Sequence, residues 1–236
     1  MDNLVEARCL VKSYNGLRAL NDFNFTVERG RIVGLLGPNG SGKTTFIKIL
    51  SGLLTSDSGF VLINGKTPGF ETKSMVSYLP ERPYFNSWMR VDECLDYFED
   101  FYEDFDRFVA ERMLADLGVP IDAKLKTLSK GTKEKVQLIL VMARRAQLYL
   151  LDEPIAGVDP AARDYILDTI ISTYNKEASI IISTHLITDV EKVLDDFAFI
   201  SNGHVVVSGS AQELREQKNM SLDEYFREVF RCYRSC

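Results

Sequence analysis

Cysteine, histidine and long apolar runs are scarce in this chain of 236 residues, and each shortage excludes a class of protein. Its four cysteines are dispersed without C-x-x-C spacing, which argues against a zinc site or a disulfide framework and favours reduced thiols. No apolar run approaches the ~18 residues of a membrane span, and the first residues lack the basic and apolar regions of a secretory signal. We therefore expect a soluble protein that stays inside the cell.

Positive charge is also in short supply, with a net charge of -6 and a pI of about 5.1. This balance argues against a protein that grips nucleic acid through overall positive charge. Otherwise the composition is ordinary for a globular protein, at 45% hydrophobic and 26% charged residues. The length suggests one or two domains with a sizeable core.

Short apolar runs alternate with longer helical patterns, which predicts a parallel sheet built from βα units. The candidate strands are Ile32–Leu36, Phe60–Ile63, Val76–Leu79, Leu148–Leu151, Ser179–Ser183, Phe197–Ser201 and His204–Ser208. Before them, Leu4–Ser13 and Phe23–Glu28 indicate an antiparallel pair, with the turn Tyr14-Asn15-Gly16 between its early elements. Asn202-Gly203 is typical of a type I′ hairpin turn.

Residues Tyr84 to Ala146 are interpreted as a helical insertion that interrupts the sheet. Within it, Asp92–Asp106 contains eight acidic residues and no basic one, with apolar residues at helical spacing. This pattern predicts an amphipathic helix whose acidic outer face is solvated, although such a face could also meet a partner. A tail begins at Gly209, and the capping-box pattern from Ser221 to Glu224 predicts a last helix.

A phosphate-binding motif follows the first predicted strand of the parallel sheet. Residues 37–44 read Gly-Pro-Asn-Gly-Ser-Gly-Lys-Thr, which fits G-x-x-x-x-G-K-[ST], and a helical pattern follows over Thr45–Leu54. Glycines let backbone N–H groups turn toward phosphates, and the helix N-terminus adds partial positive charge. We expect Lys43 to reach the β- and γ-phosphates of a nucleoside triphosphate and Thr44 to ligate Mg²⁺.

Two carboxylates follow another buried strand, in the segment 148–154, which reads Leu-Tyr-Leu-Leu-Asp-Glu-Pro. The carboxyl ends of strands are where α/β sheets bind ligands. Asp152 is expected to hold Mg²⁺ through its water shell, and Glu153 to orient and polarise the attacking water. A plain polar turn before proline is the alternative interpretation.

A third segment, 128–132, reads Leu-Ser-Lys-Gly-Thr and precedes a helical pattern over Lys133–Arg145. Placed after the phosphate-binding motif and before Asp152, it resembles the signature of the ATP-binding-cassette (ABC) family, which is usually Leu-Ser-Gly-Gly-Gln. The resemblance covers about residues 4–210 and implies a P-loop NTPase (RecA-like) α/β fold. Such a fold has a mostly parallel sheet core, an antiparallel β edge and an inserted helical subdomain.

The resemblance also implies roles for individual residues. Tyr14 stands where an aromatic ring stacks on adenine, and Glu81 where the family usually has a glutamine that ligates the metal. His185 stands at the position of a histidine that contacts the γ-phosphate, and residues 156–159 resemble the D-loop. The nucleotide-binding set is then Tyr14, Gly37, Pro38, Asn39, Gly40, Ser41, Gly42, Lys43, Thr44, Thr45, Ser129 and Gly131; the metal set is Thr44, Glu81 and Asp152; the catalytic set is Lys43, Glu153 and His185.

Plainer interpretations stay open for several of these residues. Ser129 could be an ordinary helix cap, His185 a core histidine, and Tyr14 an exposed aromatic residue in a turn. Glu81 could be a solvated loop residue. Two signature positions depart from the family pattern, since Lys130 replaces its first glycine and Thr132 its glutamine.

The resemblance implies an ATP-hydrolysing subunit of a membrane transporter, with ATP as substrate and Mg²⁺ as cofactor. The chain is expected to form one nucleotide-binding domain, with an ATPase core over 1–83 and 147–210, a helical subdomain over 84–146 and a helical tail over 211–236. The expected partners are a second ATPase subunit and a separate transmembrane permease that holds the protein at the inner face of the membrane. Nucleic acid is not an expected partner.

The chain is short, with a short helical insertion and a short tail, and in this it resembles the export-type cassettes of bacterial drug, antibiotic-peptide and lipid-linked exporters. The length excludes a translation or resistance factor with two cassettes. The forty-six residues between Glu81 and Leu128 are too few for the heptad insertion of a chromosome or repair ATPase. A small P-loop kinase or GTPase would not need the segment 128–132. A regulatory ATPase without a transported substrate remains the alternative.

Overall fold

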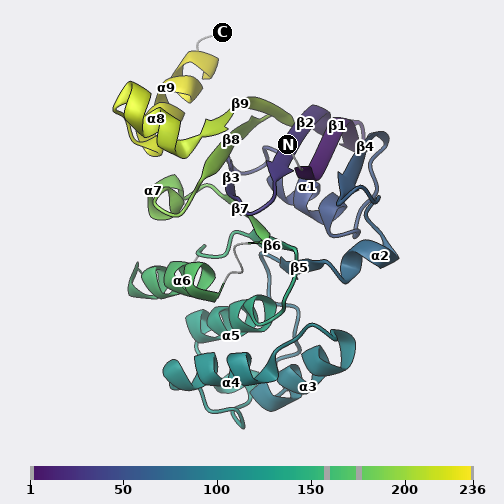
Figure 1. Ribbon diagram of the computed structural model, residues 1–236, viewed down its shortest axis with the longest axis vertical. Helices are drawn as coiled ribbons and strands as arrows, with labels where there is room; N and C mark the ends of the chain where they lie inside the picture. The colour runs from purple at the N-terminus through teal and green to yellow at the C-terminus, as the bar shows by residue number, and fades with distance from the viewer. Residues whose placement is uncertain (1–2, 157–159, 174–176, 235–236) are drawn as a thin grey trace.

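The computed structural model describes residues 3–156, 160–173 and 177–234. A six-stranded sheet forms its centre and a three-stranded antiparallel sheet lies beside it (Figure 1). The strands are β1 (Asn3–Tyr14), β2 (Leu17–Glu28), β3 (Ile32–Leu36), β4 (Ser58–Ile63), β5 (Val76–Leu79), β6 (Leu148–Asp152), β7 (Ser179–Thr184), β8 (Asp196–Ser201) and β9 (His204–Ser210).

The six-stranded sheet has the order β5-β6-β7-β3-β8-β9. Its first five strands run parallel, and β9 pairs antiparallel with β8 at the edge. Strands β3, β6 and β7 are buried along their whole length, as expected of parallel strands covered on both faces. Asn202 and Gly203 both have positive φ, as a type I′ turn requires. The prediction of a mostly parallel α/β sheet with an antiparallel edge is confirmed.

One predicted strand belongs to the other sheet. Phe60–Ile63 lies in β4, which pairs antiparallel with β1 instead of joining the parallel sheet. Strand β2 also begins at Leu17, directly after the turn at Asn15 and Gly16, six residues before the predicted start. Polar and apolar residues are mixed over 17–22 without strict alternation, so the sequence pattern does not mark this part of the strand, and pairing with β1 holds it there.

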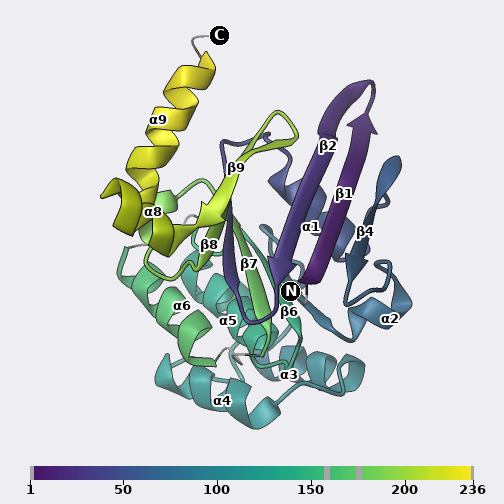
Figure 2. The same ribbon diagram turned by 45° about the horizontal axis from the view of Figure 1, so that its top comes forward.

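Helices cover both faces of the six-stranded sheet. The described helices are α1 (Lys43–Leu50), α2 (Phe70–Lys73), α3 (Val91–Phe101), α4 (Arg107–Asp116), α5 (Lys130–Met142), α6 (Pro160–Thr173), α7 (Ile187–Val190), α8 (Ala211–Lys218) and α9 (Leu222–Arg234), with a 3-10 turn, η1, at Leu125–Thr127. Helix α1 lies between the two sheets, in one apolar core, and α5, α6 and α9 pack against the opposite face of the six-stranded sheet, in a second core (Figure 2).

Helices α3, α4 and α5 share a third apolar core, made wholly of residues between Val91 and Ala143. The amphipathic helix predicted over Asp92–Asp106 is wrong at its end, because α3 stops at Phe101. The acidic residues beyond that point have other partners: Asp104 accepts hydrogen bonds from buried Arg144, and Asp106 caps α4 by accepting from the Val109 N–H.

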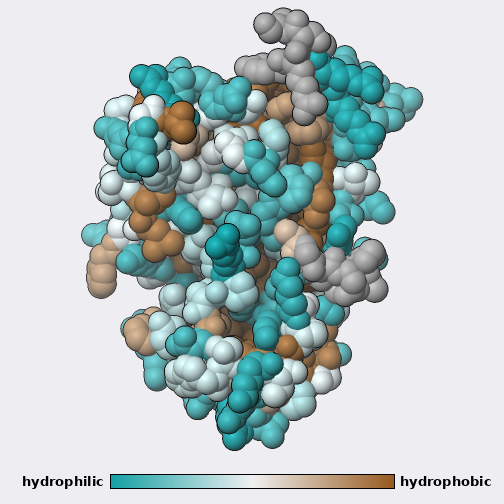
Figure 3. Space-filling model, turned by 180° about the vertical axis from the view of Figure 1, so that it is seen from behind, coloured by the Kyte–Doolittle hydropathy of each residue, from teal (hydrophilic) through white to brown (hydrophobic). Residues whose placement is uncertain are grey.

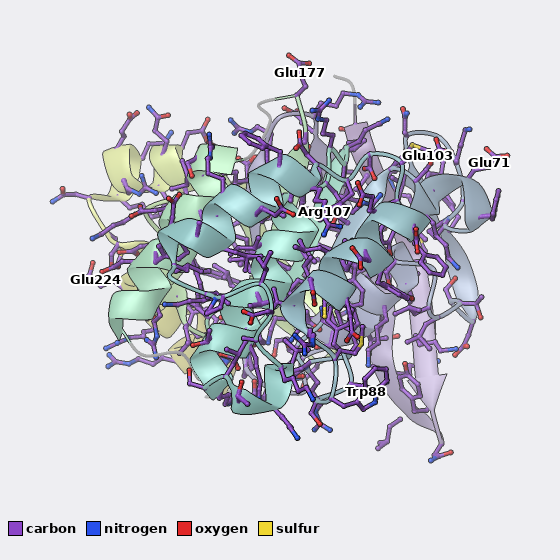
Figure 4. All side chains as sticks on the ribbon, turned by 90° about the horizontal axis from the view of Figure 1, so that it is seen from below. Glu71, Trp88, Glu103, Arg107, Glu177 and Glu224 are labelled. Carbon is purple, nitrogen blue, oxygen red and sulfur yellow. The ribbon has the colours of Figure 1, made fainter. Side chains whose placement is uncertain are left out.

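Arg107, the first residue of α4 (labelled in Figure 4), donates to three carboxylates, those of Asp96 and Glu99 in α3 and Glu111 in α4. The acidic outer face of α3 is therefore partly neutralised by the helix that follows it. The bounds of two other predicted helices also differ. Helix α1 runs over Lys43–Leu50 instead of Thr45–Leu54, and α5 runs over Lys130–Met142, directly after its cap Ser129, instead of Lys133–Arg145.

The C-terminal segment forms α8 and α9. The predicted capping box is present, since the Glu224 N–H donates to Ser221 Oγ and the Ser221 N–H donates to Glu224 Oε2. Phe226 and Phe230 pack against Phe199 of β8. In the space-filling view, hydrophilic residues cover most of the rear face, and a narrow hydrophobic strip runs on the side of the C-terminal helices (Figure 3). Among the described residues, no helix is long and apolar enough to cross a membrane.

Candidate functional site

The loop over residues 37–42 joins β3 to α1 and is held by close backbone packing. A Cβ atom on Gly42, whose φ is 111°, would lie 2.4 Å from the carbonyl oxygen of Ala19 in β2. A Cβ atom on Gly37 would lie 2.3 Å from the carbonyl oxygen of Ile200 in β8. Glycine is thus required at both places, and the loop is pressed between two strands with Pro38, Asn39 and Gly40 exposed.

Lys43 is the first residue of α1 and is only 5% exposed. Its Nζ donates to the carbonyl oxygens of Gly37 at 2.8 Å and Pro38 at 3.2 Å, and lies 3.8 Å from Glu153 Oε1. Burial lowers the pKa of Lys43, and the charge of Glu153 opposes that shift. The first N–H groups of α1, including those of Thr44 and Thr45, have no partner within the helix, so the loop presents donors and a cation together.

Asp152 ends β6 and is 1% exposed. Its Oδ1 accepts hydrogen bonds from Thr44 Oγ1 at 3.2 Å and from Ser183 Oγ. Its Oδ2 is buried and has no hydrogen-bond partner among the described residues. Burial raises the pKa of Asp152, and the two hydroxyl donors oppose that shift. The phosphate-binding loop and the end of β6 are thereby joined through a carboxylate with one oxygen unused.

Glu153 follows directly, and two neighbouring side chains hold its carboxylate. Its Oε2 accepts from Thr184 Oγ1 at 2.9 Å, and His185 Nδ1 lies 3.0 Å from Oε1 and 3.1 Å from Oε2. The side chain is 8% exposed. The backbone of Glu153 has φ 52°, a left-handed conformation that costs a non-glycine residue about 1 kcal/mol or more. The fold therefore strains the backbone at Glu153 and holds its carboxylate through Thr184 and His185.

Glu81 lies in the loop after β5 and lines one cavity with Glu134, Asp152 and Glu153. Its charge acts on the pKa values of both Lys43 and Asp152, so it belongs to the same electrostatic cluster. Glu134 comes from α5; burial raises its pKa, and Lys130 Nζ lies 3.8 Å from its Oε1. The cavity is thus acidic and joins the end of β6 to α5.

Ser129 caps α5 by accepting from the Thr132 N–H at 3.1 Å, and the two hydroxyls lie 2.7 Å apart. Thr132, in place of the expected glutamine, therefore closes the cap. Gly131 has open space around the position of a Cβ atom, so packing among the described residues does not require a glycine there. The Lys130 side chain is 73% exposed. This helix end therefore lies at the surface. Among the described residues it makes no hydrogen bond or ion pair with the Lys43 side chain.

Tyr14 ends β1 and is 43% exposed, with Lys12 Nζ 5.8 Å from its ring centroid. Of the predicted D-loop, Ala156 is described and residues 157–159 lie outside the described residues. His204 begins β9, and its Nε2 lies 2.9 Å from Asn21 Nδ2.

Two side chains of the site were not predicted. Ser183 donates to Asp152, and Thr184 donates to Glu153 and accepts from the Leu186 N–H. Both end β7, the strand that pairs with β6. Hydroxyl residues at the end of a strand beside an Asp-Glu pair are the signal that could have found them, because parallel neighbours end at the same edge of the sheet.

Known proteins resemble this chain in sequence. A family profile described as ABC transporter matches residues 20–156. The ABC-type transporter ATP-binding protein EcsA of Bacillus subtilis is 31% identical over 239 residues, which cover 96% of this chain and 96% of EcsA. The SkfA peptide export ATP-binding protein SkfE of the same organism is 30% identical over 234 residues, covering 97% and 96% of the two chains.

Solved structures agree with these sequence relatives. A structure described as the ATP binding subunit of an ABC transporter is 31% identical, with a TM-score of 0.84, and covers 96% of this chain and 99% of its own. A nucleotide-free ATP-binding cassette from an ABC transporter has a TM-score of 0.79 at 24% identity and covers 97% and 98% of the two chains. The second likeness supports the fold alone.

Proposed function

Because this chain belongs to the ABC transporter family as an ATP-binding protein, and the family's cassettes hydrolyse ATP, we propose that it powers export of a substrate through a separate membrane permease. In this proposal it works as a dimer of cassettes at the cytoplasmic face of the membrane. The observation that carries the proposal is the position of Glu153, held by His185 and Thr184 at the end of β6 beside Asp152 and Lys43.

The proposed chemistry assigns one task to each group. Lys43 and the N–H groups of residues 40–45 bind the phosphates of ATP, and Tyr14 stacks on the base. Glu153 accepts a hydrogen bond from the attacking water and polarises it toward the γ-phosphate, and His185 orients Glu153 and contacts that phosphate. Because Lys43 now donates to the carbonyls of Gly37 and Pro38, it must exchange those partners for phosphate oxygens when ATP binds.

The residues present fit a magnesium ion. Asp152 has a buried oxygen without a partner, and Thr44 Oγ1 lies 3.2 Å from the other oxygen. No group of three or more His, Cys, Asp or Glu side chains in the described ranges could hold a metal alone, so the ion would depend on Thr44, Asp152, Glu81 and phosphate oxygens. When bound, Mg²⁺ neutralises charge that develops on the phosphates.

The open surface at the start of α5 supports the proposal that a second ATPase subunit binds there. A glycine in the first turn of a helix costs stability and gains nothing from packing around Gly131. Ser129, Gly131 and the helix N-terminus offer a polar, uncrowded face to an anion. We propose that this face meets the γ-phosphate of ATP bound by the second cassette, and that residues 84–146 form the helical unit that carries it there.

The permease would contact an aromatic surface on the same unit. This aromatic surface consists of the exposed side chains of Tyr84, Trp88, Tyr97 and Phe101, of which Trp88 points outward from the molecule (Figure 4). Tyr97 and Phe101 stack with ring centroids 4.5 Å apart, and the acidic residues of α3 flank them. Cytoplasmic loops of membrane proteins are rich in Lys and Arg, which complements this surface. The relative SkfE is a peptide export ATP-binding protein, which supports export as the direction of transport.

Purification from detergent-solubilised membranes tests the proposal. We expect the tagged chain to bring down one membrane protein in constant ratio, and Trp88→Ala together with Phe101→Ala to abolish that recovery while ATP hydrolysis continues. Phe70→Ala, which removes an aromatic side chain that is 93% exposed on α2, is the matched control. If the tagged chain is recovered with its ATPase activity but without any membrane protein, a regulatory ATPase would be favoured instead.

A further inference from the structure

Three segments that are far apart in the sequence meet at Ala19 of β2. A Cβ atom on Gly42, at the start of α1, would lie 2.4 Å from the Ala19 carbonyl oxygen, and one on Gly203, in the β8–β9 turn, would lie 2.8 Å from it. The Gly203 N–H donates to the carbonyl oxygen of Ser41, and the Asn21 N–H donates to the carbonyl oxygen of Gly203. The phosphate-binding loop is therefore fastened to the beginning of β2.

A side-chain network lies on this junction. Arg18 Nη1 donates to Asn21 Oδ1 at 2.7 Å, and Asn21 Nδ2 lies 2.9 Å from His204 Nε2. Since the amide oxygen of Asn21 is taken by Arg18, its NH₂ group faces the imidazole, and His204 Nε2 acts as the acceptor. His204 thereby fixes the orientation of Asn21, and Asn21 in turn holds the guanidinium of Arg18.

Arg18 is exposed, and the bond to Asn21 is its one side-chain hydrogen bond among the described residues. The other N–H groups of a guanidinium, which has five, are left for another acceptor. Its neighbours along β2 define where that acceptor would be. Leu17 is paired with Tyr14, the residue proposed to stack on the base, and Ala19 touches Gly42 at the start of the phosphate-binding helix.

We propose that Arg18 is a nucleotide-binding residue that contacts the α-phosphate, and that Asn21 and His204 are the residues that position it. A nucleotide that runs from Tyr14 to the N-terminus of α1 passes Arg18 between its base and its β-phosphate. Arginine pairs well with phosphate because its planar group donates two parallel hydrogen bonds. This inference rests on the proposed function, because it takes the loop over residues 37–44 as the phosphate site.

Calorimetric titration of the isolated chain with ADP and with a non-hydrolysable ATP analogue, both with Mg²⁺, tests the proposal. We expect Arg18→Gln to weaken both nucleotides by the same factor, about tenfold, because both carry the α-phosphate and one charged hydrogen bond is lost. Arg18→Lys should lose less. Arg8→Gln is the matched control, since Arg8 is also exposed on the antiparallel sheet and pairs with one residue, Glu6.

The positioning role has a separate readout. Asn21→Ala should weaken ADP binding by a few-fold in the wild-type background and not at all in the Arg18→Gln background, because it acts only through Arg18. Additive losses would overturn the positioning role. If Arg18→Gln binds ADP like Arg8→Gln, or loses affinity for the ATP analogue alone, the assignment of Arg18 is wrong while the proposed function stands. A wild-type chain that binds neither nucleotide would overturn the proposed function together with this inference.

Discussion

His185 Nδ1 lies 3.0 Å from one carboxylate oxygen of Glu153 and 3.1 Å from the other. A carboxylate oxygen accepts hydrogen bonds, so the imidazole donates from Nδ1, and its Nε2 has no hydrogen-bond partner among the described residues. The side chain of His185 is 40% exposed while that of Glu153 is 8% exposed. The histidine thus covers the carboxylate from the solvent side and leaves its other nitrogen for a group arriving from outside.

Replacing His185 should therefore lower kcat far more than it changes KM for ATP. We expect His185→Ala to lower kcat by roughly 10- to 100-fold, since a positioned acid–base or orienting group contributes on this order. His185→Gln should retain more activity, because an amide N–H can replace the Nδ1 donor. Steady-state phosphate release at varied ATP measures both parameters, and a kcat equal to that of the wild-type chain would remove His185 from the mechanism.

Lys43 should determine nucleotide affinity. Lys43→Ala removes the cation nearest the loop, so ATP binding should weaken by at least about tenfold, the effect of one charged hydrogen bond. The fold should survive, because the loop is also held by packing of Gly37 and Gly42 against neighbouring strands. Equilibrium binding of ATP measures the change. Lys48→Ala, in the last turn of the same helix, should bind as the wild-type chain does; equal losses in the two variants would contradict a specific role.

Asp152 should make the chain less stable as the pH rises. Burial raises the pKa of Asp152 above the ordinary value of 3.8. At a pH between 3.8 and the raised pKa, the folded chain therefore binds more protons than the unfolded chain. The free energy of unfolding therefore falls as pH rises through this window, and above it the buried charge destabilises the fold. Asp152→Asn should melt higher than the wild-type chain near pH 7, and the gap should narrow as the pH is lowered toward 4.

Thermal melts of both proteins across this pH range measure the effect without nucleotide or Mg²⁺. A gain of about 1 kcal/mol corresponds to ~2–4 °C in a chain of this size. Adding Mg²⁺ and ADP should then stabilise the wild-type chain more than the variant, because the ion loses a carboxylate ligand. A gap that widens as the pH falls would show that burial of the charge does not control this contribution.

Glu81 should affect the requirement for Mg²⁺. It lines the same cavity as Asp152, and an extra carboxylate strengthens attraction to a hard cation. Glu81→Gln should keep activity within a few-fold but raise the Mg²⁺ concentration for half-maximal rate, whereas Glu81→Ala should lower kcat considerably more. A magnesium titration of the three proteins decides the matter, and superimposable curves would leave Glu81 an ordinary loop residue.

The sequence predicts the central sheet well because its parallel strands are continuous apolar runs. Strands β3 and β5 begin and end where predicted, and β6 and β7 differ by one residue each. The pattern of apolar residues does not predict where a helix ends when tertiary contacts determine that end. The end of α3 depends on Arg144, which draws Asp104 away from the helix and donates to the carbonyl of Val76 at 2.7 Å. No local periodicity contains that information.

The candidate site shows the same division. Lys43, Asp152 and Glu153 are found from sequence because fixed spacing follows from the chemistry of phosphate and metal binding. Ser183 is not, because only its bond to Asp152 of the neighbouring strand identifies it. Arg18 is not, because it is singled out only through Asn21, which His204 of β9 contacts. The aromatic surface was also missed, since the sequence does not say which aromatic residues of the insertion enter the core shared by α3, α4 and α5.

Release of phosphate from ATP by Glu153→Gln, set beside ATP binding by the same protein, tests the central claim most directly. The substitution keeps the size of the side chain and its oxygen acceptor for Thr184, and removes the charge that polarises water. We expect ATP binding within a few-fold of the wild-type chain, turnover reduced by at least about 100-fold, and a dimer trapped by ATP in size-exclusion chromatography. Normal turnover by Glu153→Gln would contradict the account.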